Sequence, residues 1–223
     1  MKKFLLALTA LVIFAGSSFA ATSPETIISE ATSMIGEMSS QNDVSTMANT
    51  VKSSRAIAIV PSMVKAGFIL GGEYGEGLIL RYEGGKWYGP SFYNIGGGSF
   101  GLQIGAQSVS LLLAVTNEKG VGAFMGSKTK LGGDFSIAAG PMGRRAEAAT
   151  DAQVKASIYS YSIAKGLFAG VSLDGSVISI SVKRNKQYWG DKVTAKEALQ
   201  KPADDTRILP LVKALDELIK KAN

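Results

Sequence analysis

Eight basic residues in the second half of the chain could bind an anionic ligand. They lie mostly where strands are expected to end or turn: Lys128, Lys130, Arg144, Arg145, Lys165, Lys183, Arg184 and Lys186. If several of these strand ends meet at one rim of a sheet, the side chains form a positively charged cluster that can bind phosphate head groups. The alternative is a scatter of charges that only keeps the protein soluble. From charge and position, the predicted head-group residues are Arg144, Arg145, Lys165, Lys128 and Lys130.

Catalytic chemistry is restricted because the chain has neither histidine nor cysteine. This composition excludes Ser-His-Asp and Cys-His catalysis, thiolate chemistry and nearly all zinc sites. A pair of carboxylates could still act as acid and base; the candidates are Glu73, Glu76, Glu118, Asp134, Glu147 and Asp151. Their spacing selects no pair. The sequence therefore predicts a protein that is not an enzyme and has no catalytic residue, no cofactor and no metal.

The stretch from Pro90 to Gly105, PSFYNIGGGSFGLQIG, organises the chain. Its glycines match the spacing G-x-G-x-x-G of dinucleotide sites, but that motif must open a helix. Here an alternation typical of a strand follows, with Leu102 and Ile104 on one face. We interpret the glycines as structural, because they allow left-handed or closely approaching backbone. The structural glycine motifs are Gly71, Gly72, Gly96, Gly97, Gly98 and Gly101.

Residues 1–20 have the pattern of a secretory signal peptide. A positively charged start precedes an apolar run, and Ser18-Phe19-Ala20 is a small-x-Ala cleavage site. The alternative, a membrane anchor, is disfavoured because the apolar run is too short to span a bilayer. Without Lys2 and Lys3 the formal charge falls from +6 to +4, which does not indicate a nucleic-acid binder. We expect a periplasmic or secreted protein with no lipid anchor, since no lipobox cysteine exists.

Helices are expected at both ends of the remaining chain. Ser23-Pro24 is an N-cap with proline at the first helical position, and apolar residues then recur at helical spacing. The polar face of this helix is acidic, so packing on its own domain is favoured over insertion into a membrane. We assign residues 21–43 to this N-terminal amphipathic helix and residues 44–223 to the following domain. A final helix is expected to open at Asp204 or Asp205.

Between the helices the sequence indicates many short strands. Arg55–Val60 is a buried type of strand that Pro61 should stop, and residues 110–115 are apolar on both faces. Residues 177–182 complete a hairpin. Turns are expected at Gly75–Gly77, Gly84-Gly85 and Asp174-Gly175. The predicted fold class is α+β, a predominantly antiparallel sheet of barrel or sandwich type with amphipathic helices at the N- and C-terminal ends.

The order and spacing of several motifs between Val44 and Leu199 resemble the SYLF domain. These motifs are Lys65–Phe68, Gly71–Gly75, Pro90–Tyr93, Gly96–Gln107, Asn117–Gly120, Ala138–Arg144 and Lys165–Ser176. SYLF is the lipid-binding domain of yeast actin-patch proteins and plant FYVE-domain proteins, and many exported bacterial proteins look like it. The resemblance implies a β-rich domain that binds phosphoinositides or other anionic phospholipids. It also implies an actin partner, by analogy with the eukaryotic members alone.

The resulting hypothesis is a non-enzymatic periplasmic protein that binds anionic, phosphoinositide-like head groups at a membrane surface. The alternative is an interaction or structural module of the cell envelope, with a protein partner and no lipid ligand. Eukaryotic members link lipid binding to a basic N-terminal segment, whereas the helix after Ser23 is acidic here. Nucleic acid is not an expected partner.

Overall fold

A computed structural model of the protein describes residues 22–41, 44–133, 135–140, 156–164, 167–169, 173–191 and 193–223. For residues 67–70, 99–105 and 167–169 it describes the backbone alone. The elements in chain order are α2 (Pro24–Ser39), α3 (Val44–Ser53), β1 (Ala56–Glu83), β2 (Lys86–Val115), α4 (Glu118–Gly122), β3 (Lys128–Lys130), β4 (Ile137–Ala139), β5 (Ile158–Ala164), β6 (Leu167–Ala169), β7 (Val177–Ile180), α6 (Val182–Trp189), α7 (Ala195–Ala198) and α8 (Leu209–Ile219).

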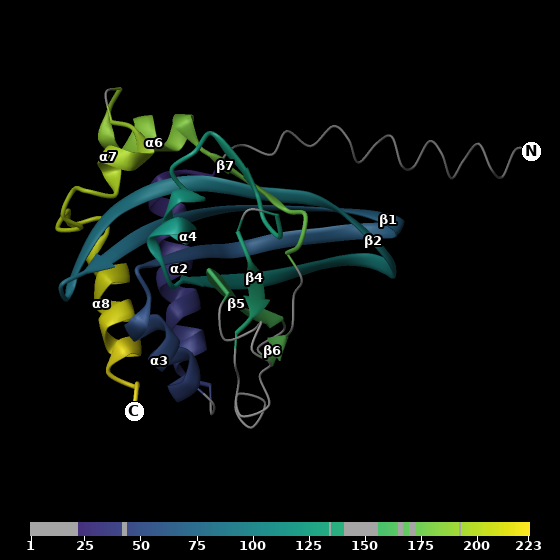
Figure 1. The fold of residues 1–223 in the computed structure, drawn as a ribbon, viewed down its shortest axis with the longest axis horizontal. Helices are drawn as coiled ribbons and strands as arrows, with labels where there is room; N and C mark the ends of the chain where they lie inside the picture. The colour runs from purple at the N-terminus through teal and green to yellow at the C-terminus, as the bar shows by residue number, and fades with distance from the viewer. Residues whose placement is uncertain are drawn as a thin grey trace, which may run out of the picture.

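A long antiparallel ribbon of β1 and β2 forms the centre of the fold (Figure 1). The two strands pair from Ala56 opposite Val115 to Glu83 opposite Lys86. Gly84 and Gly85 connect them, both with positive φ, as a tight hairpin turn with the twist of its strands requires. The predicted turn at these glycines is confirmed.

The predicted strand end at Pro61 and the predicted turn at Gly75–Gly77 are both wrong. β1 continues through Pro61, where the register against β2 shifts between Val60 and Met63. Such an irregularity accommodates a proline inside a strand. At Gly77 a Cβ atom would lie 2.3 Å from the carbonyl oxygen of Ile59. The glycines therefore lie where one part of β1 passes close to the backbone of an earlier part, near Ile59. The ribbon bends back on itself at the end farthest from α8 (Figure 1).

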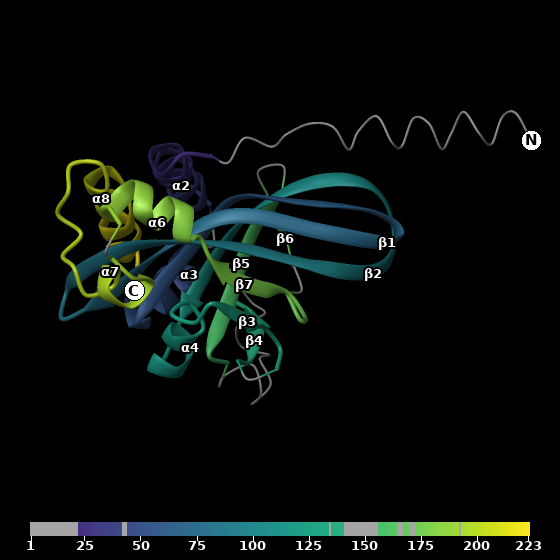
Figure 2. The same cartoon turned by 90° about the horizontal axis from the view of Figure 1, so that it is seen from above.

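Five short strands extend the ribbon into one curled, mostly antiparallel sheet. The order is β3-β7-β2-β5-β4, with β1 paired to β2 and β6 paired to β5. Only the β4–β5 pair is parallel among the strand pairs of the described residues. Leu131 and Phe135 form an isolated bridge in the segment between β3 and β4, which are the two end strands of this order. Figure 2 shows α6 and α8 at the end of the ribbon opposite its bend.

Three further sequence expectations need correction. The alternation of Leu131, Gly133, Phe135, Ile137 and Ala139 predicts one strand, but of these five residues only Ile137 and Ala139 lie in a strand, β4. The expected strand of residues 177–182 ends at Ile180, and α6 begins two residues later. The triple glycine lies inside β2 and not at a turn.

Apolar side chains fill both sides of the sheet. Alternate residues of β1 divide between them: Ile57 and Ile59 pack with the helices α2, α3 and α8, whereas Ala58 and Val60 face a second core around Phe124. This two-sided burial explains why these segments are apolar at every position. The α+β class, the mainly antiparallel sheet and the terminal helices are confirmed.

The helix ends follow local capping chemistry. Ser23 caps α2 by accepting a hydrogen bond from the Thr26 backbone N–H. α8 begins at Leu209, later than the predicted Asp204 or Asp205, and the Asp205 carboxylate accepts hydrogen bonds from the backbone N–H and the side chain of Arg207. None of the helices that the structure describes is long and apolar enough to cross a membrane.

Candidate functional site

Lys128 and Lys130 form a small basic edge on the sheet. Both belong to β3, which pairs with β7 on one side. Residues two apart on a strand share a face, and both side chains are exposed. Neither side chain makes a hydrogen bond or ion pair with any of the described residues. The edge thus presents two adjacent ammonium groups to solvent.

The other predicted head-group residues, Arg144, Arg145 and Lys165, lie outside the described residues. Arg144 follows Gly140, the last described residue after β4, by four positions in the sequence.

The basic residues around α6 do not act as one cluster. Lys183 and Lys186 are exposed, and the Lys186 Nζ lies 3.0 Å from the Asp191 Oδ1. Arg184, in contrast, is only 3% exposed and forms an ion pair with Glu76 of β1. Arg184, one of the eight basic residues considered for the rim but not one of the five predicted head-group residues, is therefore buried in a structural ion pair.

Arg184 connects three separate parts of the chain. Its Nε donates a 2.9 Å hydrogen bond to the backbone oxygen of Thr22. Its Nη1 donates to the Asn94 Oδ1 at 2.8 Å and to the Ser181 Oγ at 2.9 Å. The start of α2, the strand β2 and the start of α6 therefore meet at one guanidinium.

Glu76 completes this cluster from the other side. Its carboxylate accepts hydrogen bonds from the Thr22 N–H at 3.3 Å and from the Tyr74 hydroxyl at 3.0 Å. Burial by itself would raise the pKa of Glu76, but these two hydrogen bonds and the charge of Arg184 outweigh it and lower the pKa below its ordinary value. Burial, and next the neighbouring carboxylate, raise the pKa of the Tyr74 hydroxyl.

A second carboxylate, Glu73, is also bound by neighbouring side chains. Its Oε2 lies 2.8 Å from the Lys65 Nζ, and its Oε1 accepts a hydrogen bond from the Ser176 hydroxyl. A Cβ atom at Gly97 would lie 3.2 Å from the Ser176 Cα and 3.4 Å from Glu73 Oε1. The absence of a side chain at Gly97 therefore lets the segment before β7 approach this ion pair.

The remaining glycines of the motifs differ in how tightly they are packed. A Cβ atom at Gly96 would lie 3.1 Å from the backbone oxygen of Glu73, whereas Gly72 and Gly98 have ordinary spacing of 3.9 and 4.0 Å to backbone oxygens. Gly71 pairs with Ser99 and Gly101 with Ile69 within the ribbon. Close approach thus explains Gly96 and Gly97, while the others lie along the bend.

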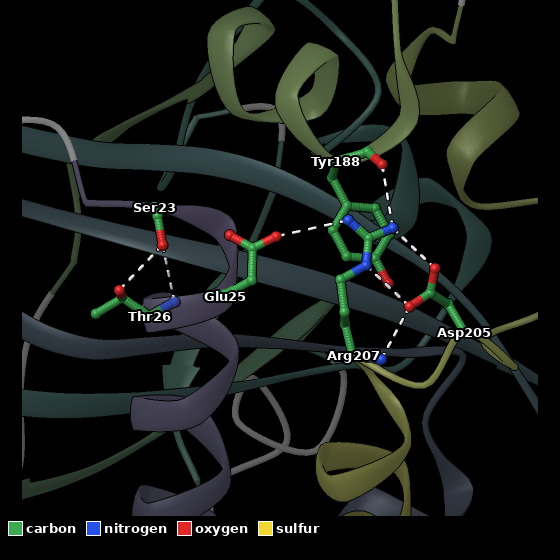
Figure 3. Close-up of polar contacts among 6 residues, drawn as sticks. All are labelled: Ser23, Glu25, Thr26, Tyr188, Asp205 and Arg207. Carbon is green, nitrogen blue, oxygen red and sulfur yellow. Dashed lines mark hydrogen bonds and ion pairs between the residues drawn. The ribbon is translucent and has the colours of Figure 1, made fainter.

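A third polar cluster ties α2 to the segment before α8 (Figure 3). The Arg207 guanidinium lies 3.9 Å from the ring centroid of Tyr188, and its Nη1 lies 3.5 Å from the Glu25 Oε1. Asp205 binds it through two oxygens, Oδ1 to Nε at 2.9 Å and Oδ2 to Nη2 at 2.8 Å. These hydrogen bonds lower the pKa of Asp205 to about 2. Burial, and next the charge of Asp205, raise the pKa of Tyr188 to about 12.

None of these clusters has the composition of an active site. Glu73 and Glu76 are each bound to a cation, so they do not form a free acid–base pair. No group of three or more carboxylates that could hold a metal ion occurs in the part of the chain that is described. The polar chemistry of the described structure joins elements to one another, and the basic edge is left as the candidate binding surface.

Comparison with known proteins places the chain in a family. Residues 96–221 match the family model Ysc84, described as a Las17-binding protein and actin regulator. The chain belongs to the Ysc84 (SYLF) family. The resemblance expected from the glycine-rich motifs is confirmed, and the match extends past Leu199 through α8.

Several eukaryotic Ysc84 relatives are similar to most of the chain. An SH3 domain-containing protein of Schizosaccharomyces pombe is 40% identical over 171 residues, covering 74% of this chain and 40% of the relative. The SH3 domain-containing YSC84-like protein 1 of Xenopus laevis is 35% identical over 154 residues, 68% of this chain and 46% of the relative. LAS seventeen-binding protein 3 of Saccharomyces cerevisiae is 37% identical over 155 residues, 68% and 34%. The chain spans less than half the length of each of these relatives.

Sequence reasoning missed the residues that position α6. Arg184, Asn185 and Tyr188 are buried on this helix, while Lys183, Lys186 and Gln187 are exposed. The signal was present, since buried positions at i, i+1 and i+4 follow helical spacing. It was hidden because two of the buried side chains are polar, and polar residues are normally read as exposed.

Proposed function

We propose that the protein is a non-enzymatic, exported member of the Ysc84 family that binds surfaces of anionic phospholipid through its basic edge. The observation that carries this proposal is the pair Lys128 and Lys130, exposed on the same face of β3 and without a partner among the described side chains. Exposed ammonium groups attract lipid phosphates and carboxylates, each contributing about 1 kcal/mol near an anionic surface.

The rest of the basic surface is proposed to come from Arg144 and Arg145. What supports including them is their charge and their adjacency in the sequence, four and five residues after Gly140. Lys165, which follows β5 directly, is the fifth proposed contact. Guanidinium groups suit phosphate oxygens because they donate two hydrogen bonds in one plane.

The non-enzymatic part of the proposal is supported by the carboxylates and by the relatives. Glu73 and Glu76, the two described carboxylates nearest to burial, serve as ion-pair partners. The relatives are named for SH3 domains and for Las17 binding, and the family as an actin regulator, not for a reaction. An exported protein does not ordinarily meet actin, so we propose an acidic lipid surface as its partner in the envelope.

Co-sedimentation with vesicles tests the proposal. Mature protein, residues 21–223, is mixed with neutral vesicles and with vesicles that also contain anionic lipid, at low and high salt. We expect binding to the anionic vesicles alone, weakened by salt because screening shortens the reach of exposed charges. The variants Lys128→Ala/Lys130→Ala and Arg144→Ala/Arg145→Ala should each weaken binding.

The matched control is Lys196→Ala/Lys213→Ala, which removes the same charge from exposed positions of α7 and α8. It should bind as the unchanged protein does. An equal loss of vesicle binding in the control would show that binding depends on net charge alone. It would reject the basic edge as the binding surface. No binding to either vesicle would reject lipid binding and favour the alternative, an envelope module with a protein partner.

A further inference from the structure

The two lysines of the basic edge share one face of the sheet with an exposed aromatic side chain three strands away. Residues that pair directly across neighbouring strands point to the same side of a sheet. Tyr74 of β1 pairs with Gly96 of β2, which pairs with Val177 of β7. Val177 in turn pairs with Lys130 of β3. This row therefore carries Tyr74 and Lys130 on the same face, separated by three strand spacings, roughly 14 Å.

A second row of paired residues lies beside the first on the same face. Glu76 of β1 pairs with Asn94 of β2, which pairs with Ser179 of β7. Ser179 in turn pairs with Lys128 of β3. Each lysine of the basic edge thus stands at the end of one row. We name the two rows together the open face.

The open face begins where the helices stop covering the sheet. The next residue pair on this side of the ribbon, Leu78 with Phe92, is buried in the core that α2 and α8 share. Tyr74, four positions before Leu78 on β1, is 51% exposed. Arg184, which binds Glu76, lies at the boundary. Beyond this boundary the face is exposed at both of its ends, the tyrosine and the two lysines.

The Tyr74 ring is held against the sheet. Its hydroxyl donates a 3.0 Å hydrogen bond to the Glu76 Oε1, and its Cδ2 lies 3.6 Å from the position of a Cβ atom at Gly96. A side chain that is fixed before binding loses little conformational freedom when a partner covers it. Tyrosine is also enriched at the level of lipid head groups, because its ring is apolar and its hydroxyl is polar. The ring therefore suits a contact at the surface of a bilayer.

The charge of the open face is positive, and its middle is polar. Glu76 is paired with Arg184, so the net charge of the face is that of its two lysines. Arg184 also binds the Asn94 Oδ1, whereas neither the Asn94 Nδ2 nor the Ser179 Oγ has a hydrogen-bond partner among the described residues. Both groups can donate hydrogen bonds to phosphate or ester oxygens. The whole face thus complements an anionic lipid surface, and not only its β3 edge.

We propose that the open face lies flat on the membrane, with its two lysines at lipid phosphates and Tyr74 between the head groups. This inference rests on the proposed function and extends the contact from β3 across the sheet to β1. A bilayer surface fits because it is wide enough to cover both ends of the face and anionic enough to attract the lysines. The sheet, and not the N-terminal helix, then makes the contact. The exposed side of α2 carries Glu30 and Glu37, which an anionic surface repels.

Co-sedimentation of tyrosine variants with anionic vesicles tests the contact at β1. Tyr74→Ala should weaken binding by about fivefold at low and at high salt, because an apolar contact is not screened. The effect of Lys128→Ala/Lys130→Ala should shrink as salt rises. Tyr74→Phe keeps the ring and should bind almost as the unchanged protein does. The matched control is Leu209→Ala at the start of α8, where the side chain is 45% exposed; it should have no effect.

A fluorescent label gives a second readout that does not depend on removing the tyrosine. The chain has no cysteine, so a single Ser179→Cys change directs an environment-sensitive dye to the open face. The matched change Ser33→Cys directs the same dye to the exposed side of α2. On addition of anionic vesicles, the emission of the dye at position 179 should shift to the blue, while the dye at position 33 should not respond.

The outcomes separate this inference from the proposed function. Binding that depends on the lysines but not on Tyr74, without a response at position 179, would overturn the inference and leave the function standing. A response at position 33 alone would also overturn it and assign the contact to α2. Absence of binding to any vesicle would reject the proposed function, and this inference with it.

Discussion

At the scale of single residues, the fold depends on side chains that replace missing backbone partners. Asn185 accepts a 2.9 Å hydrogen bond from the Phe92 N–H and donates one of 3.0 Å to the Phe92 oxygen. It also donates to the Ser181 oxygen at 3.1 Å. Asn185 is 3% exposed. The amide therefore binds the Phe92 N–H just beyond the last β2–β7 residue pair, Tyr93 and Ile180.

Replacing Asn185 with leucine should lower the free energy of unfolding by about 1–3 kcal/mol, because the buried Phe92 N–H loses its partner, while the Phe92 oxygen keeps the hydrogen bond from the Ser181 N–H. Urea denaturation monitored by circular dichroism measures the change. The control is Gln187→Leu, an exposed position of the same helix, which should change stability by less than about 0.5 kcal/mol. Equal effects of the two variants would show that the hydrogen bonds to Phe92 are unimportant.

Gly77 permits the crossing of the ribbon with its own backbone. Gly77→Ala should lower the free energy of unfolding by about 2 kcal/mol or more, because the new Cβ would lie 2.3 Å from the Ile59 oxygen. Gly122→Ala is the control, since nothing lies within 4 Å of its Cβ position. That change should leave stability equal or slightly higher. A neutral Gly77→Ala in the same denaturation experiment would contradict the close approach.

At the scale of elements, ion pairs hold the N-terminal helix to the sheet. The backbone of Thr22 donates to Glu76 and accepts from Arg184, so both of its polar groups are fixed just before α2. Arg207 then binds Glu25 within the first turn of that helix. α2 is thus attached through its first residues as well as through its apolar face.

Arg184→Met should lower stability at neutral pH by about 3 kcal/mol, because Glu76 is left without its cation in a largely buried place. The pKa of Glu76 is lowered in the folded protein, so its contribution is present above its unfolded pKa and is lost as pH falls through the folded pKa. The difference in the free energy of unfolding between the variant and the unchanged protein should therefore become smaller as the pH falls toward 4. Lys183→Met, an exposed neighbour, is the control. A difference that stays constant with pH in denaturation curves would contradict this account.

At the scale of the whole molecule, the absence of histidine determines the response to pH. Histidine is the side chain whose ordinary pKa falls between pH 5 and 8, and this chain has none. The shifted carboxyls of Glu76, Glu197 and Asp205 all have lowered pKa values. The stability that they contribute is complete above their unfolded pKa values and is lost only in acid.

The midpoint of thermal unfolding should therefore be flat between about pH 5 and 8 and fall below about pH 4. Asp205→Asn should reduce the part of this fall between about pH 4 and pH 2, since the pKa of Asp205 is about 2 in the folded protein. The effect should stay below about 1 kcal/mol because the carboxylate is largely exposed to solvent. A midpoint that moves between pH 5 and 8 would contradict the prediction.

The sequence by itself determined the fold class, the family and the ends of several elements. The spacing of apolar residues located α2 and the interior strand at residues 110–115, because that spacing follows directly from burial on one or both faces of an element. The turn at Gly84-Gly85 and the cap at Ser23 were also predictable, since local chemistry decides them. The motifs that resemble SYLF were sufficient to identify the family.

Only the tertiary structure decided what the glycines and the charged residues do. Gly75 and Gly77 look like a turn, yet they lie inside β1, since the requirement for glycine comes from Ile59 and Val60 on another part of the ribbon. In the sequence Arg184 resembles a surface cation. In the structure it is buried and paired with Glu76, which is more than a hundred positions earlier in the chain. Local sequence shows the conformation that a residue can adopt. The partner it meets depends on how the ribbon bends and the sheet curls, which many distant contacts decide together.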